Sequence, residues 1–327
     1  MRIAYVANPD IPIPVEEGYG GLERQVTWIS AEMIRRGHEV TIYGNVPLGP
    51  SKWGWVGRPI FSQHDILTHA DELPAFDVVH DRTKDHPTRL LPTVRSLHTV
   101  VWSDQPTRPA VYPSEAVREF YKDPTAPVIP ECVPVDELPF PNWGDYFLCF
   151  GRIDPIKGQD LAVAVAVHHG AKLVVAGHVG RWGDQYYALT IRELCRRAGF
   201  EFVPNPTNSE VRKLIGNAQG LIHTHRWLES FSEVVAEALC QGVPVLTTDP
   251  GAPKEWVDTT TGGCIVRLQD LESGNFDGCR KFFDWMKSGA YDSTHRDHIQ
   301  QAARGLFNVQ RVASLYEEVY KRVAGPA

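Results

Sequence analysis

HTHRWLESFSEVVAEALCQGVPVLTTDP, residues 223–250, is the stretch that decides the fold of this chain. It reads as a strand end, a loop, a helix, a turn and a second strand. Apolar residues recur at helical spacing over residues 231–239, and Gly242 ends this helix. Residues 243–247 are a short β-branched run, typical of a buried strand. Similar strands and helices alternate along the whole sequence, which predicts an α/β protein built on parallel sheets.

Two carboxylates of this stretch, Glu229 and Glu237, are separated by seven residues. Ser230 and Glu233 have the S-x-x-E spacing of a capping box, which predicts a helix that starts near Ser230. Glu229 then lies in the loop at the mouth of the helix, and Glu237 lies inside the helix. The free N–H groups of a helix N-terminus suit a phosphate, and carboxylates accept hydrogen bonds from sugar hydroxyls. The stretch therefore predicts a site for a sugar nucleotide.

The length and composition predict a globular protein of two domains, because the chain has 327 residues, of which 43% are hydrophobic and 22% charged. The formal net charge of −7 disfavours a nucleic-acid-binding protein. No apolar run reaches the roughly 20 residues of a membrane span, so we expect no integral membrane segment. The N-terminus lacks the features of a signal peptide, and the six cysteines form no C-x-x-C pair. Both observations predict a cytoplasmic protein.

The N-terminal part begins with a β-loop-α-β pattern. Residues 2–7 are typical of a buried parallel strand, residues 22–34 have one apolar helical face, and residues 40–43 form the next strand. Gly20 and Gly21 lie at the turn before the helix, where open α/β sheets bind their ligands. The pattern lacks G-x-G-x-x-G, which argues against a dinucleotide-binding site.

A second strand-to-helix loop carries two basic residues. Residues 146–150 (YFLCF) form a strand, residues 151–158 (GRIDPIKG) form the loop, and a helix follows from residue 159. Gly151 lets the strand end tightly, and Arg152 and Lys157 converge from two sides of the loop. Two cations placed in this way can clamp a diphosphate and neutralise its charge as it departs.

These motifs together resemble family 4 of the retaining glycosyltransferases, also described as glycosyl transferases group 1. The similarity rests on E-x7-E from Glu229, on G-R-x4-K-G from Gly151, and on YGGLERQV from Tyr19. It implies the GT-B fold, in which two Rossmann-like, doubly wound domains face one another across a cleft. We expect an acceptor-side domain over residues 1–141 and a donor-binding domain over residues 142–307. A C-terminal helix in residues 308–327 is expected to pack back on the first domain.

The resemblance also implies a role for each candidate site residue. Glu229 faces the donor sugar, Glu237 binds the ribose hydroxyls, and His98 approaches the donor sugar from the first domain. The candidate catalytic residues are Arg152, Lys157, Glu229 and His98. The residues expected to bind the donor nucleotide are Gly20, Gly21, Gly151, Ser230, Phe231, Ser232, Glu233 and Glu237.

Three residues depart from the family pattern. Ser232 occupies a position where the family usually has glycine, and Glu131 and Cys132 replace an Asn-Gly turn. A positive φ would cost more free energy at Ser232 than at a glycine. These departures keep open the hypothesis of a non-catalytic protein that binds a sugar nucleotide.

The expected activity is retaining transfer of a hexose from a nucleoside diphosphate sugar to an acceptor hydroxyl. The sequence contains no D-x-D pair, so we expect Arg152, Lys157 and the helix N-terminus to meet the charge of the leaving diphosphate without a metal. The resemblance implies that the diphosphate itself takes the acceptor proton. His223 and His225 have H-x-H spacing, but no third zinc ligand lies nearby, and we expect them to pack at a strand end.

The expected partners follow from this activity. The donor is a substrate, with UDP- and GDP-sugars favoured, and no cofactor is expected. The acceptor stays open between a small molecule, a glycan and a lipid-linked sugar. A sugar phosphorylase or a sugar-nucleotide epimerase of the same fold remains an alternative, because a basic clamp would serve these enzymes too.

Overall fold

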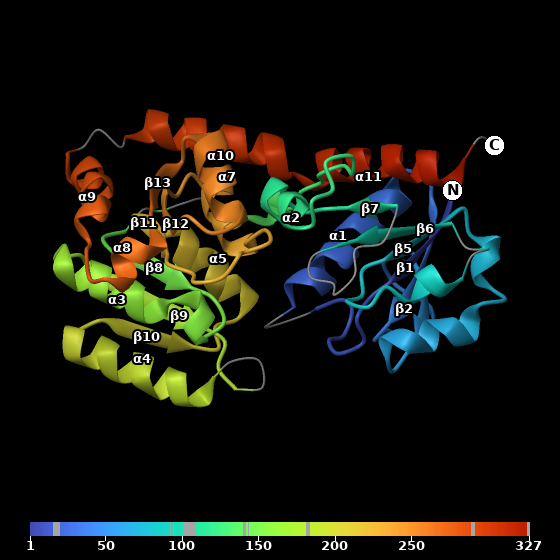
Figure 1. Ribbon diagram of the computed structural model, residues 1–327, viewed down its shortest axis with the longest axis horizontal. Helices are drawn as coiled ribbons and strands as arrows, with labels where there is room; N and C mark the ends of the chain where they lie inside the picture. Colours follow the sequence, from blue (N-terminus) through green and yellow to red (C-terminus); the bar gives the residue numbers. More distant parts are fainter. Residues whose placement is uncertain are drawn as a thin grey trace. The chain divides into compact units, whose positions relative to one another are not determined.

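The computed structural model describes residues 1–15, 20–91, 93, 95–100, 109–139, 142, 144–180, 184–288 and 292–325 (Figure 1). Tyr19 of the YGGLERQV motif and the predicted boundary at residue 141 lie outside the described residues. The chain divides into two compact units. Unit 1 contains residues 1–15, 20–132 and 308–325, and unit 2 contains residues 133–307, within the described ranges.

Unit 1 is built on a seven-stranded sheet with the order β3-β4-β2-β1-β5-β6-β7. Neighbouring strands pair in parallel, except that β3 is antiparallel to β4. The strands are β1 Arg2–Val6, β2 Glu39–Gly44, β3 Gly49–Pro50, β4 Val56–Pro59, β5 Val78–Asp81, β6 Ser96–Thr99 and β7 Ala110–Val111. The helices are α1 Gly21–Arg35, α2 Glu115–Phe120 and α11 Val309–Ala324, with the 3-10 helices η1 Gln63–His69, η2 Leu73–Ala75 and η3 Pro87–Leu90.

Alternate residues of β1 point to opposite faces of this sheet and so contact different helices. Ile3 and Tyr5 belong to a buried cluster that includes residues of α1 and α11, whereas Ala4 and Val6 pack with residues of η1 and η2. The hydroxyls of Tyr5 and Tyr320 are hydrogen-bonded at 2.9 Å. The last helix of the chain is therefore part of the core of unit 1, where it lies beside α1 (Figure 1).

Unit 2 is built on a six-stranded, fully parallel sheet with the order β10-β9-β8-β11-β12-β13. The strands are β8 Phe147–Phe150, β9 Leu173–Gly177, β10 Glu201–Pro204, β11 Gly220–His223, β12 Val245–Thr248 and β13 Gly263–Val266. The α-helices are α3 Gln159–His168, α4 Gln185–Ala198, α5 Asn208–Gly216, α6 Glu233–Cys240, α7 Ala252–Thr260, α8 Leu268–Glu272, α9 Arg280–Lys287 and α10 Ser293–Phe307. The 3-10 helices are η4 Val135–Glu137, η5 Pro155–Lys157 and η6 Asp277–Cys279.

Helices cover both faces of the second sheet. Phe147 and Cys149 of β8 pack with residues of α3, α4 and α9, and Leu148 packs on the other face with residues of α5, α6, α7 and α10. Figure 1 shows α3 and α4 on one side of the sheet and α7 and α10 on the other. Because all the strands are parallel, their carboxyl ends meet at one edge, and the loops before η5 and α6 both start from that edge.

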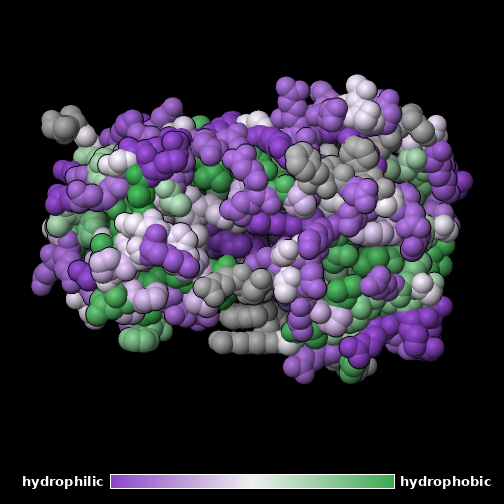
Figure 2. Space-filling view, turned by 180° about the vertical axis from the view of Figure 1, so that it is seen from behind, coloured by the Kyte–Doolittle hydropathy of each residue, from purple (hydrophilic) through white to green (hydrophobic). Residues whose placement is uncertain are grey.

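Polar and apolar residues are mixed over the face of the protein that Figure 2 shows. Apolar side chains that stand singly on a surface are normal for globular proteins. In the part of the chain that the structure describes, no helix has the length and apolar character needed to cross a membrane.

Candidate active site

The loop after β8 carries Arg152 and Lys157. The side chain of Asp154 accepts a hydrogen bond from the N–H of Ile156 at 3.2 Å and so begins η5, which ends at Lys157. The Arg152 guanidinium faces Asp154, with 3.5 Å between Nε and Oδ2, whereas Lys157 pairs with Glu229. The two cations that the sequence placed at one diphosphate therefore contact different carboxylates in this structure.

Gly158 closes the loop and brings it against the end of β11. Its φ is 67°, a left-handed conformation that residues with a side chain rarely adopt, and α3 begins at the next residue. A Cβ atom at this position would lie 1.9 Å from Thr224 O. Thr224 Oγ1 also donates to Gly158 O at 2.7 Å. Only glycine therefore fits where the loop of Lys157 meets the loop of Glu229.

Lys157 and Glu229 are in contact although 72 residues separate them in the chain. Lys157 Nζ donates to Glu229 Oε2 at 2.6 Å, and both side chains are largely buried. Trp227 Nε1 donates to the same oxygen at 2.8 Å, and the Lys157 ammonium lies 4.9 Å from the centre of the Trp227 ring. Burial would raise the pKa of Glu229, but Lys157, His225 and Trp227 together outweigh burial and lower this pKa. Glu229 is therefore ionised at neutral pH and can only accept hydrogen bonds.

The helix after Glu229 begins later than the sequence predicts. α6 starts at Glu233, so the predicted start near Ser230 with its capping box is wrong. Ser232 instead adopts a φ of 67°, and its hydroxyl is hydrogen-bonded to His223 Nε2 at 3.2 Å. Because Ser232 uses its hydroxyl in this way, its side chain does not cap α6. The dipole of α6 therefore favours an anion at this end of the helix, which has no side-chain cap from Ser232.

The hydrogen bond to His223 explains how a serine can replace glycine at position 232. The left-handed backbone costs a residue with a side chain about 1–2 kcal/mol, and a hydrogen bond contributes about 1 kcal/mol in return. We expect Ser232→Gly to keep the free energy of unfolding within about 0.5 kcal/mol of the wild type. We expect Ser232→Ala to lose about 1–2 kcal/mol, because it keeps the strain and leaves His223 without this partner. Urea denaturation checks both values, and equal losses in the two variants would contradict this explanation.

Glu237 lies inside α6, as predicted, and its side chain is buried. Arg212 of α5 lies nearby, with 4.0 Å between its Nε and Glu237 Oε1, and it also donates to Glu137 at 3.0 Å. The loop in front of α6 is fixed by Phe231, which is buried and whose carbonyl accepts a hydrogen bond from Trp256 Nε1 at 2.8 Å. Glu237 is thus a buried carboxylate on the helix whose N-terminus lacks a cap from Ser232.

The residues that the sequence analysis missed lie beside those that it identified. Trp227 hydrogen-bonds Glu229, and Arg226 hydrogen-bonds Asp160 in the first turn of α3. The backbone N–H of Ala252 also donates to Glu229 O at 2.8 Å. Trp227 and Arg226 stand directly before Glu229 in the opening stretch, but no periodicity marks such loop residues. Only the folded chain brings them to their partners.

His223 and His225 pack together at the end of β11. Their ring centres lie 4.7 Å apart, and both residues are buried. His225 Nδ1 is hydrogen-bonded to Thr248 Oγ1 at 3.0 Å. Burial lowers the pKa of both histidines, that of His223 strongly, so both rings are neutral at pH 7. Within the described ranges, no group of three His, Cys, Asp or Glu residues could hold a metal ion.

In unit 1, Gly20 and Gly21 form the start of α1. Gly20 is the N-cap residue, with a φ of 151°, and it provides no side-chain cap. A Cβ atom on Gly20 would lie 2.8 Å from Cγ2 of Val15, so the loop packs too tightly for a side chain there. Neither glycine therefore places a side chain at the N-terminus of α1.

His98 lies on β6 and is buried. Its Nδ1 donates to Pro109 O at 3.3 Å, and its Nε2 is hydrogen-bonded to Thr88 Oγ1 at 3.3 Å. Burial lowers the pKa of His98 to about 4, so the ring is neutral at pH 7. In this structure His98 is held by neighbours within unit 1.

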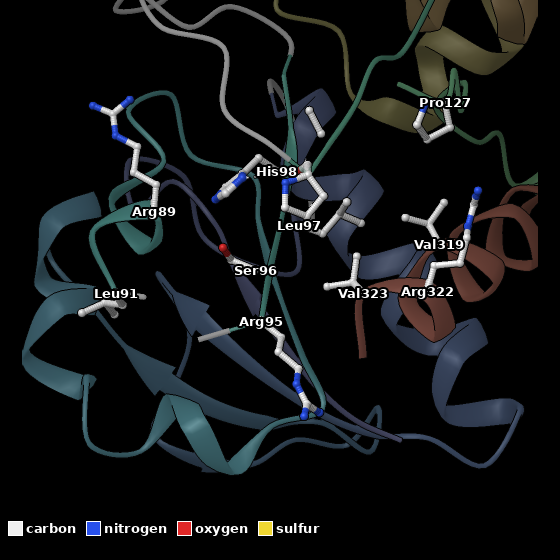
Figure 3. A pocket seen from close by; sticks show the side chains of 12 residues that line it. Arg89, Leu91, Arg95, Ser96, Leu97, His98, Pro127, Val319, Arg322 and Val323 are labelled. Carbon is white, nitrogen blue, oxygen red and sulfur yellow. Dashed lines mark hydrogen bonds between the residues drawn. The ribbon is translucent and has the colours of Figure 1, made fainter. Parts of the chain in front are cut away.

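A cavity of about 570 Å³ borders His98 in unit 1 (Figure 3). It is lined largely by apolar residues and arginines, among them Leu97, Ala110, Val319, Val323, Arg89, Arg95 and Arg322. The three arginine side chains extend in different directions in Figure 3. They therefore do not form a single anion-binding cluster, although the cavity has the volume of a small-molecule site.

The two departures at residues 131 and 132 have structural partners in unit 1. Arg82 Nη2 donates to Glu131 Oε1 at 2.5 Å, and both side chains are buried. The backbone N–H of Cys132 donates to Gln25 Oε1 at 2.7 Å, and Gln25 Nε2 donates to the backbone carbonyl of Cys132 at 2.9 Å. Glu131 and Cys132 therefore connect the end of unit 1 to β5 and α1.

Three comparisons with known proteins agree with this architecture. Residues 136–272 match the family model described as glycosyl transferases group 1. The chain is similar to YtcC of Bacillus subtilis (strain 168), with 22% identity over 100% of this chain and 93% of the relative.

Among solved structures, the chain is similar to AviGT4, a glycosyltransferase involved in avilamycin A biosynthesis, with 23% identity, a TM-score of 0.77 and coverage of 100% of this chain and 98% of that one. A glycosyltransferase from Rickettsia africae ESF-5 has 18% identity and a TM-score of 0.78, with coverage of 100% and 99%. HepE of Anabaena in complex with UDP and glucose has 13% identity and a TM-score of 0.73, with coverage of 97% and 98%. Residues 136–272 thus match a glycosyl transferases group 1 domain, and the whole chain has the GT-B fold.

Proposed function

We propose that this protein is a retaining glycosyltransferase that moves a hexose from a nucleoside diphosphate sugar to an acceptor hydroxyl without a metal ion. The observation that carries the proposal is the buried pair of Lys157 and Glu229 in the glycosyl transferases group 1 domain, next to the loop that leads into α6. A diphosphate sugar offers a partner to each of these groups. The diphosphate attracts the ammonium, and the sugar hydroxyls donate to the carboxylate.

Donor binding in this proposal is an exchange of partners. Lys157 leaves Glu229 Oε2 and pairs with the diphosphate, and Glu229 then accepts hydrogen bonds from the hexose. Arg152 and the N-terminus of α6 neutralise the remaining negative charge. Glu237 accepts hydrogen bonds from the ribose hydroxyls. All of these groups are on unit 2, so we assign the donor to this unit.

The proposed reaction uses the leaving group as the base. The bond between the anomeric carbon and the diphosphate oxygen breaks, and Lys157 and Arg152 stabilise the charge that develops on the diphosphate. The diphosphate oxygen takes the proton of the acceptor hydroxyl, whose oxygen bonds to the anomeric carbon on the same face. Glu229 is paired with Lys157 and Trp227 and is assigned to orienting the sugar, not to covalent catalysis.

The structural relatives support a nucleotide sugar as donor. The structures of Anabaena HepE contain UDP, UDP and glucose, or UDP-glucose. We therefore propose a UDP-sugar first and a GDP-sugar second. The acceptor is assigned to unit 1, and Gly20, Gly21 and His98 of this unit keep the donor-side roles that the family resemblance implies for them.

The three departures from the family pattern do not favour the non-catalytic alternative. Ser232 adopts the left-handed backbone that glycine would allow, and Glu131 and Cys132 have partners in the fold of unit 1. The departures are thus accommodated by local contacts and remove none of the groups assigned to the donor.

Glu237→Ala should weaken nucleotide binding more than it slows the reaction. Loss of hydrogen bonds to a charged group costs about 1.5–3 kcal/mol, so we expect the Kd for the nucleoside diphosphate to rise roughly 10- to 100-fold. We expect kcat at saturating donor to fall by less than about fivefold, because Glu237 is not assigned to the reacting atoms. Calorimetry and initial rates give the two numbers, and Glu193→Ala, at an exposed carboxylate on α4, is the control. An unchanged Kd would remove the ribose role of Glu237.

Donor turnover tests the proposal itself. UDP-, GDP- and ADP-linked hexoses are incubated with the protein in the presence of EDTA, and released nucleotide and sugar are followed by ¹H NMR. We expect slow hydrolysis of one donor class, a first-formed sugar with the donor's anomeric configuration, and no effect of EDTA. Binding without turnover for any donor, with or without added acceptors, would favour the non-catalytic alternative. Turnover that requires inorganic phosphate would favour a phosphorylase.

A further inference from the structure

The distance between Lys157 and Glu229 is set by contacts between two separate loops. Lys157 belongs to the loop after β8, and Glu229 belongs to the loop after β11. Because the two residues are 72 positions apart, chain connectivity does not hold them together. The side chains that join the loops therefore decide whether both groups can reach one donor.

Arg226 joins the two loops through four hydrogen bonds. Its Nη1 and Nη2 donate to Oδ1 and Oδ2 of Asp160, both at 2.7 Å. Nη1 also donates to Pro155 O at 2.9 Å, and the backbone N–H of Arg226 donates to Ile156 O at 2.7 Å. Paired hydrogen bonds between a guanidinium and a carboxylate fix orientation as well as distance, which a lysine does not reproduce.

Asp160 is held on its other side, so the pair is anchored at both ends. Tyr187 OH donates to Asp160 Oδ1 at 2.6 Å, and the N–H of Asp160 donates to Tyr187 OH at 3.2 Å. Arg226 Nε lies 3.3 Å from Glu272 Oε1. Burial would raise the pKa of Asp160, but the Arg226 guanidinium and the Tyr187 hydroxyl, with the N–H of Leu161, together outweigh burial and lower this pKa, so the pair stays ionised at neutral pH.

The neighbours of this pair are the groups assigned to the donor. Pro155 and Ile156, whose carbonyls bind Arg226, form η5 together with Lys157. The residue after Arg226 is Trp227, which donates to the same Glu229 oxygen as Lys157. One side chain thus fixes the backbone on both sides of the Lys157–Glu229 contact.

We propose that Arg226 and Asp160 are positioning residues that hold Lys157 in place while it exchanges Glu229 for the diphosphate. The pair acts through Lys157 and Glu229 and does not contact the donor. A rigid support of this kind lets the ammonium meet the diphosphate without movement of η5. This inference rests on the proposed function of the Lys157–Glu229 site.

Comparison of nucleoside diphosphates with monophosphates tests the inference, because Lys157 is assigned to the diphosphate and a monophosphate lacks its second phosphate. Calorimetric Kd values are measured for UDP and UMP, GDP and GMP, and ADP and AMP, with the wild type, Arg226→Lys and Asp160→Asn. For the nucleotide base that binds, we expect each variant to lower the ratio of the monophosphate Kd to the diphosphate Kd at least about tenfold. The monophosphate Kd should change less than about twofold. Arg196→Lys, at an exposed arginine paired with Glu193, is the matched control and should change neither Kd.

A double variant separates positioning from general support of the fold. When Lys157→Ala is already present, Arg226→Lys should cause no further loss of diphosphate affinity, because the group that it positions is gone. Equal losses for monophosphate and diphosphate, or an unchanged preference in both variants, would overturn the positioning role and leave the proposed function intact. A wild type that binds none of the six nucleotides would overturn the proposed function and this inference together. Asp160→Asn is nearly isosteric, so it provides the decisive result if Arg226→Lys unfolds.

Discussion

Lys157→Ala is expected to lower kcat/KM for the donor by about two to three orders of magnitude. The ammonium is assigned to the diphosphate, where negative charge develops as the sugar leaves, and loss of one such contact typically costs 10²–10³ in rate. The substitution also removes the ion pair of the buried Glu229 carboxylate and leaves it the hydrogen bond from Trp227. We therefore expect the protein to lose stability as well, since removal of one partner from a largely buried ion pair is costly. Initial rates over a range of donor concentrations give kcat and KM separately.

Two further variants provide a parallel test and a control for this result. Arg152→Ala should lower kcat/KM in the same direction, because Arg152 is assigned to the same diphosphate. Lys172→Ala, at an exposed lysine that pairs with Asp145, should have no effect on turnover. Wild-type activity in both Lys157→Ala and Arg152→Ala would show that these cations do not neutralise the diphosphate.

Gly158→Ala is expected to destabilise unit 2 by more than about 3 kcal/mol. The new Cβ atom would lie 1.9 Å from Thr224 O, a backbone atom that no rotamer change can move away, and the backbone has a φ of 67°. Backbone strain and a backbone clash then add, and together they account for a loss of this size in the free energy of unfolding. Urea denaturation followed by circular dichroism measures the loss.

Gly199→Ala is the matched control for Gly158→Ala. Gly199 follows α4 with a φ of 71°, but nothing lies within 4 Å of a Cβ atom built there. The control therefore keeps the backbone strain and lacks the clash, and we expect it to cost about 1 kcal/mol. If the two substitutions cost the same, the contact between the loop of Lys157 and Thr224 does not restrict the fold.

Much of the fold could be predicted because its strands and helices have strong local signals. The helix expected from residue 159 is found as α3, Gln159–His168, between the left-handed Gly158 and the buried strand β9. Local signals were misleading where tertiary contacts compete with them. The helix does not start at Ser230, the serine of the expected capping box. Ser232 instead adopts a left-handed backbone before the helix and hydrogen-bonds His223.

The sequence names candidate site residues one by one, but it does not give the contacts between them. The motifs identified Lys157 and Glu229 as donor residues, yet nothing in either motif indicates that the two side chains pair with each other. Arg226 and Trp227 escaped notice for a similar reason, since their partners are fixed by a contact between two loops and not by sequence spacing. Resemblance could suggest which residues matter, whereas only the fold shows what holds them.

Calorimetric titration of the wild type with UDP, GDP and ADP in EDTA tests the central claim most directly. A ligand that binds the native state releases or absorbs heat on titration and raises the melting temperature by mass action. We predict metal-independent binding of one of the three diphosphates, lost or strongly weakened in Lys157→Ala and kept in Lys172→Ala. Absence of binding for all three, or binding that Lys157→Ala leaves unchanged, would contradict the assignment of this site to a nucleoside diphosphate sugar.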